Sequence, residues 1–126
     1  MHLTKAEEQV MLILWEMGEG IVKDIRDRYK DPRPARNTIS TVIRVLEKKG
    51  FVGHKAYSNI HLYYPIIKKS EYSKSLLFAF VENYFDNSFP AMVSFYVREK
   101  DISVKELEEL LTDTKKAMKK KKRKNK

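Results

Sequence analysis

The chain has 126 residues, of which 42% are hydrophobic and 34% charged, with a net charge of +9 and no cysteine. This length fits one compact domain, or a smaller module whose appendage gains its core by oligomerising. The lack of cysteine excludes disulfides, thiolate metal sites and a cysteine nucleophile. No apolar run approaches the ~20 residues of a bilayer-spanning helix, and residues 1–4 lack a signal-peptide pattern. We therefore expect a cytoplasmic protein without membrane insertion.

The position of the charge is more informative than its sum. Residues 115–126 carry nine Lys or Arg and no acid, so residues 1–114 hold 17 bases and 17 acids. Residues 1–75 carry 14 bases and 9 acids, whereas residues 76–114 carry 3 and 8. A basic first part is typical of a nucleic-acid-binding surface. The C-terminal run, residues 115–126, is expected to be a solvated, disordered tail.

Three helices are predicted before residue 50. Thr4 and Glu7 form a capping-box pattern that begins the first helix, and Gly18 with Gly20 ends it. A shorter second helix follows and ends at Asp31-Pro32, because proline restricts the backbone at and before its own position. The third helix, about residues 35–49, has an apolar stripe that is expected to face the core. The stripe consists of Ile39, Val42, Ile43 and Leu46.

The opposite face of the third helix is polar and basic, as in a helix that reads the major groove of DNA. Asparagine can bond adenine bidentately and arginine can do so with guanine. Base contacts are expected from Asn37, Thr38, Ser40, Thr41 and Arg44. Phosphate contacts are expected from Lys48, Lys49, Lys55 and the turn residue Ser58. Such a face alone is also typical of an ordinary solvated helix, so the choice between the two interpretations depends on the segments beside it.

Two extended segments, residues 51–57 and 60–64, follow this helix and flank Ser58-Asn59. Asparagine tolerates the left-handed conformation of a tight turn, so we predict a hairpin. A hairpin directly after a basic helix is a wing, which favours DNA binding and makes residues 1–69 a winged-helix domain. His54 and His61 would face each other across the hairpin. Two imidazoles without a third ligand make a poor metal site, so neither a metal nor another cofactor is expected.

Residues 70–114 are predicted to form a helical dimerisation segment. Their apolar side chains exceed what one small helical unit can bury, and a second copy is the simplest partner. The candidate dimer core consists of Leu77, Phe80, Val81, Tyr84, Val93, Val97, Leu107 and Leu111. The expected fold class is therefore mainly α: an N-terminal winged helix, with three helices plus a β-hairpin wing, followed by a helical dimerisation segment.

These residues resemble the penicillinase repressor (BlaI/MecI) family of winged-helix regulators from Leu3 to Leu111. The most specific matches are residues 7–15, 38–41, 46–50 and 63–65. The resemblance implies a homodimeric transcriptional repressor that binds double-stranded DNA at a palindromic operator of resistance or transport genes. It also implies a membrane metalloprotease sensor pathway that cleaves the repressor at an Asn-Phe bond. The corresponding pair here is Ser94-Phe95, which departs from that pattern.

Two alternatives remain open from the sequence. A winged helix can be a protein-interaction module, and the lysine-rich tail also fits an RNA- or ribosome-associated protein. Steep salt dependence on duplex DNA would favour the repressor. An enzyme is not expected, since the chain shows no Gly-rich phosphate loop and no nucleophile motif.

Overall fold

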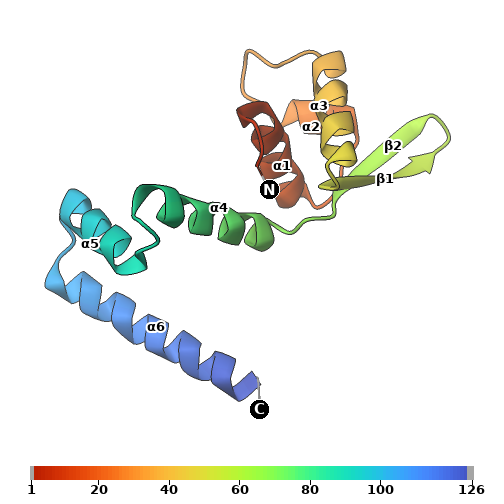
Figure 1. The fold of residues 1–126 in the computed structure, drawn as a ribbon. Helices are drawn as coiled ribbons and strands as arrows, with labels where there is room; N and C mark the ends of the chain where they lie inside the picture. The colour runs from red at the N-terminus through yellow and green to blue at the C-terminus, as the bar shows by residue number, and fades with distance from the viewer. Residues whose placement is uncertain (1, 125–126) are drawn as a thin grey trace. The chain divides into compact units, whose positions relative to one another are not determined.

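A computed structural model describes residues 2–124 (Figure 1). The elements in chain order are α1 (Lys5–Met17), α2 (Val22–Asp27), α3 (Arg36–Lys48), β1 (Val52–Tyr57), β2 (Ile60–Pro65), α4 (Lys69–Tyr84), α5 (Phe89–Lys100) and α6 (Val104–Lys124). The chain divides into two compact units, Met1–Ala79 and Phe80–Lys126, with the boundary inside α4. Among the described residues, no helix combines the length and the hydrophobicity needed to cross a membrane.

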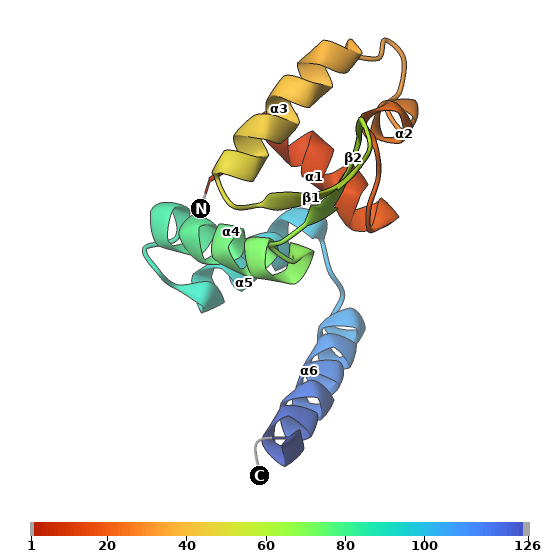
Figure 2. The ribbon, with the colours of Figure 1, turned by 90° about the vertical axis from the view of Figure 1, so that its right-hand side faces the viewer.

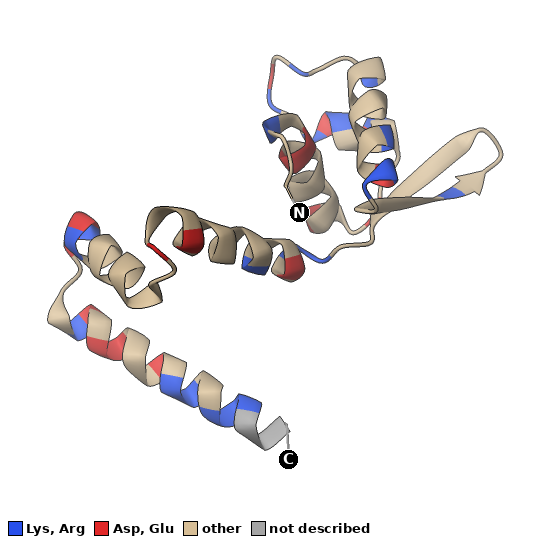
Figure 3. Cartoon of the chain, viewed as in Figure 1, with Lys and Arg blue, Asp and Glu red and all other residues tan. Residues whose placement is uncertain are grey.

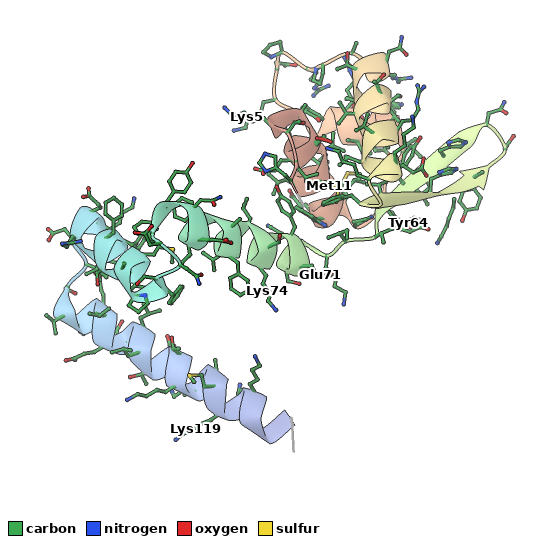
Figure 4. The ribbon with its side chains drawn as sticks, viewed as in Figure 1. Lys5, Met11, Tyr64, Glu71, Lys74 and Lys119 are labelled. Carbon is green, nitrogen blue, oxygen red and sulfur yellow. The ribbon has the colours of Figure 1, made fainter. Side chains whose placement is uncertain are left out.

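The first unit is a winged helix, which confirms the predicted fold class (Figures 1 and 2). Its core lies between the three helices and the hairpin. Met11 of α1, labelled in Figure 4, is completely buried. The other core residues are Leu3, Val10, Leu14, Ile25, Ile39, Ile43, Leu46, Phe51, Val52, Tyr63 and Tyr72. Burial of such side chains, each contributing about 1.5 to 3 kcal/mol, fixes the rotation of every helix in this unit.

Local signals set both ends of α1. The Glu7 amide donates to Thr4 Oγ1 at 3.2 Å, and the Thr4 amide donates to Glu7 Oε1 at 3.0 Å. This reciprocal pair is the predicted capping box. Gly18 ends the helix with φ at 85°, where its amide donates to the Leu14 carbonyl. Glycine suits this position because it has no β-carbon to clash in the left-handed region.

The wing is a two-stranded antiparallel sheet with Val52 opposite Pro65 and Tyr57 opposite Ile60. Its turn differs in one detail from the sequence-based expectation. Ser58, and not Asn59, has the positive φ, at 57°. A positive φ at the first loop residue alone is the pattern of a type II′ turn, which matches the twist of the flanking strands.

Gly20 has a further role that the sequence did not reveal. It forms an isolated antiparallel bridge with Tyr63, and each of their two backbone hydrogen bonds measures 2.9 Å. The segment between α1 and α2 thereby holds the inner end of β2. A β-carbon on Gly20 would lie 2.7 Å from Met17 Cε, the far end of a flexible side chain that would have to shift.

The second unit contains the end of α4 together with α5 and α6. Serine caps begin both later helices: Ser88 Oγ accepts from the Ala91 amide, and Ser103 Oγ accepts from the Glu106 amide, each at 3.2 Å. Helix α6 then continues through residues 115–124, where the sequence led us to expect a disordered tail.

Candidate nucleic-acid interface

Helix α3 presents the polar row that its periodicity predicts. The helix buries Ile39, Ile43 and Leu46 against the core. On the opposite side, five polar or basic side chains are exposed: Asn37, Thr38, Thr41, Arg44 and Lys48. Ser40 is half-buried at the edge of this row. Because the buried stripe fixes the helix rotation, the polar row is held facing solvent.

The polar row retains hydrogen-bonding capacity for a ligand. Thr41 Oγ1 donates to the Asn37 carbonyl at 2.9 Å, so its lone pairs stay available as acceptors. No salt bridge among the described residues involves Arg44. Arg36, the first residue of α3, is also exposed, although it was not among the DNA-binding candidates predicted from the sequence. Its position directly before the candidate Asn37 could have indicated that it belongs to the same surface.

A side-chain contact joins the last turn of α3 to the wing. His54 Nδ1 of β1 is hydrogen-bonded to Glu47 Oε2 of α3. The His54 ring stacks on that of His61, with centroids 4.3 Å apart and planes 11° from parallel. Within residues 2–124 no three metal-ligating side chains come together. The contact between His54 and Glu47 links the wing to α3.

The basic residues predicted to contact phosphate have different surroundings. Lys48 is exposed on α3, and Ser58 is exposed at the tip of the wing. Lys55 is exposed on β1, where its Nζ lies 5.9 Å from the centroid of the Tyr64 ring. All three residues are exposed: Lys48 within the polar row itself, and Lys55 and Ser58 on the wing that follows α3.

Lys49 differs from the others, because its ammonium group is already bound within the protein. Its Nζ donates to both carboxylate oxygens of Glu7, at 2.8 and 2.7 Å, and the Glu7 side chain is only 5% exposed. Burial acts to raise the pKa of Glu7, but hydrogen bonds from Lys49 and Thr4 outweigh it and lower the pKa below its usual value. Lys49 therefore joins α1 to the end of α3, while its side chain remains 39% exposed.

The sequence relationships agree with this geometry. The family model described as penicillinase repressor matches residues 3–116. The methicillin resistance regulatory protein MecI of Staphylococcus aureus (strain N315) is 31% identical over 113 residues, which covers 86% of this chain and 89% of that protein. The chain belongs to the penicillinase repressor family.

Two further relatives of this penicillinase repressor family member agree with the assignment. The penicillinase repressor of Bacillus licheniformis is 24% identical over 110 residues and is aligned over 86% of either chain. The solution structure of the DNA-binding domain of the repressor BlaI matches with a TM-score of 0.50 and 25% identity, over 56% of this chain and 88% of that one. The family consists of DNA-binding transcriptional repressors and not of enzymes.

The candidate dimer residues of this family member differ in exposure. Leu77, Phe80, Tyr84 and Leu111 are exposed, whereas Val93, Val97 and Leu107 are half-buried. Val81 departs from the expectation, since it is 5% exposed in the single chain and already packs inside it. Other large exposed apolar side chains on α4, α5 and α6 were not among the candidates: Leu76, Phe78, Phe89, Phe95, Tyr96, Val104, Leu110 and Met118.

The pair Ser94-Phe95 lies inside α5. Both side chains are exposed, and the Phe95 ring lies 5.6 Å from the Phe85 ring. A peptide bond inside a helix is held by the helical hydrogen bonds, so a protease that cut between these residues would need α5 to open locally.

Proposed function

We propose that the chain is a homodimeric, sequence-specific repressor that binds a palindromic operator in double-stranded DNA, acting on genes of resistance or transport. The observation that carries the proposal is the exposed polar row of α3, opposite a stripe that is buried. Membership of the penicillinase repressor family supports it. The wing beside the row supports it further, because winged helices place a helix in the major groove and a hairpin near the backbone.

In this proposal the residues divide by the part of the DNA that they meet. The groove side of α3 reads bases through Asn37, Thr38, Ser40, Thr41 and Arg44. The backbone is contacted by Lys48, Lys55 and Ser58. Lys49 is not included among the residues that contact the backbone, because its ammonium group is paired with the Glu7 carboxylate. In a symmetric dimer the two recognition helices lie about one helical turn, ~34 Å, apart on the operator.

Arg44→Ala tests the assignment of the groove side. An operator is first selected from a random duplex library with the unaltered protein, and both affinity and base preference are then measured. We expect the variant to lose about 1 to 3 kcal/mol of binding free energy and to relax its preference at one position per half-site. Unchanged affinity and preference would refute the assignment.

Lys48→Ala is the matched control on the same helix. Its lost contact is to phosphate, so binding should weaken equally on all sequences, and the slope of log K against log salt should fall by about 1. A change in base preference in the Lys48→Ala variant would contradict the assignment of Lys48 to phosphate contact and Arg44 to base reading.

A further inference from the structure

We propose that the basic half of α6, residues 115–124, is a second DNA-binding element that contacts phosphates without reading sequence. It goes beyond the proposed function, which concerns α3 and the wing. The ligand class is the phosphate backbone of duplex DNA beside the operator.

The charge of the whole chain is concentrated in this segment. Residues 115–126 carry nine Lys or Arg and no acid, while residues 1–114 carry 17 of each sign. Helix α6 changes sign along its length, with acidic positions in its first half and basic positions in its second half (Figure 3). This half of α6 therefore adds a concentrated attraction for a polyanion to that of the basic first part, residues 1–75.

The segment is also largely separate from the family's shared part. The family model ends at residue 116, and seven of the nine bases lie beyond it. These seven charges therefore lie outside the region that the family model matches. The function of these bases therefore depends on the ligand that they contact.

The described lysines of this segment are accessible to a ligand. The side chains of Lys115, Lys116, Lys119, Lys120 and Lys121 are exposed. No salt bridge among the described residues involves any of them. Figure 4 shows Lys119 extending outward from α6. Their ammonium groups are thus free to meet phosphates.

Charge density distinguishes DNA from a second copy of the chain. Residues 115–124 span ~15 Å as a helix and carry eight positive charges. Duplex DNA carries one negative charge per ~1.7 Å, or about nine over that length. The acidic half of α6 in a second copy, residues 104–113, has a net charge of only −3. Duplex DNA can neutralise the segment, whereas the partner's α6 cannot.

Repulsion between the lysines of residues 115–124 also favours duplex DNA as the ligand. Lys115 and Lys119 are four residues apart, as are Lys116 and Lys120, so each pair lies on one side of the helix and repels. Bound phosphates relieve this repulsion. Duplex DNA should therefore increase the helicity of the segment.

The test uses the full-length protein and a duplex of scrambled sequence. In one variant Lys115, Lys116, Lys119, Lys120 and Lys121 are replaced by Gln, which keeps a strong helix former at each position. The slope of log K against log salt should fall by up to about 4.5, at roughly 0.9 for each of the five lysines that contacts a phosphate. Replacement of the same residues by Arg is the control and should preserve the slope. Circular dichroism should show helicity gained with duplex by the unaltered chain but not by the Gln variant.

The outcomes separate this element from the repressor function. An unchanged slope overturns the proposal, as does a weaker dimer with the slope preserved, which would show that the lysines pair with a second copy. Tighter binding of single-stranded RNA than of duplex at equal salt also overturns it. If the slope falls although the unaltered protein prefers no operator, the element stands and the proposed function fails.

Discussion

At the residue scale, two adjacent lysines at the end of α3 have different roles. Lys48 is exposed on the polar row, whereas Lys49 is bound to the buried carboxylate of Glu7. Successive helical residues point about 100° apart, so neighbours in sequence face different surroundings. Lys48 therefore has no salt-bridge partner among the described residues, whereas Lys49, although 39% exposed, links α1 to the end of α3.

Lys49→Ala should lower the free energy of unfolding by about 1 to 3 kcal/mol, because it leaves the Glu7 carboxylate buried and without its charged partner. Urea unfolding followed by circular dichroism measures this. Lys48→Ala is the control and should change stability by no more than about 0.5 kcal/mol, as an exposed surface substitution does. Equal losses in the two variants would contradict the role assigned to Lys49.

At the element scale, the wing is connected to the rest of the first unit by one glycine turn and two contacts. Gly50 reverses the chain between α3 and β1 with φ at 83°. The Glu47–His54 contact joins the wing to α3, and the Gly20–Tyr63 bridge joins it to the segment after α1. The wing is thus connected both to α3 and to the segment after α1.

Gly50→Ala tests the backbone requirement alone. A β-carbon at this position would meet no atom within 4 Å, so steric crowding by neighbours does not contribute. The left-handed conformation should still destabilise the variant by about 1 to 2 kcal/mol, visible as a lower melting temperature. Gly50→Asn should lose less, because asparagine tolerates this conformation better. Equal melting temperatures for the two variants would argue against a backbone cause.

At the scale of the whole molecule, large apolar side chains are exposed along α4, α5 and α6. Phe80 is 45% exposed, Tyr84 74% and Leu111 54%. Exposed apolar surface of this extent is typical of an interface, and a repressor on a palindromic operator needs two copies. The proposed dimer would bury this surface and link two recognition helices.

Phe80→Glu combined with Leu111→Glu should convert the dimer to a monomer, since each change places a charge in the proposed interface. Sedimentation velocity at micromolar concentration measures the mass. Operator affinity should fall as well, because separate chains lose the gain from linked binding to two half-sites. Tyr57→Glu, at an aromatic position on the wing that is 59% exposed, should leave the mass unchanged. A stable monomer formed by the unaltered chain would disprove the dimer.

Local patterns in the sequence were sufficient for most elements and for the polar row of α3, but not for the continuation of α6 through residues 115–124. The capping box of α1 and the spacing of Ile39, Ile43 and Leu46 act through residues within a turn or two of each other. Such short-range signals are written directly in the order of residues. The exposed positions of Asn37 and Arg44 follow from the same period.

Other features were decided by tertiary packing. The partner of Lys49 lies 42 residues away, so it is specified by how α1 packs on α3. The bridge between Gly20 and Tyr63 likewise requires the hairpin to fold back on the helices. The sequence therefore indicated which face of α3 is available to DNA. That Lys49, and not Lys48, forms an ion pair could be seen only in the folded structure, because its partner Glu7 is brought to it by long-range packing.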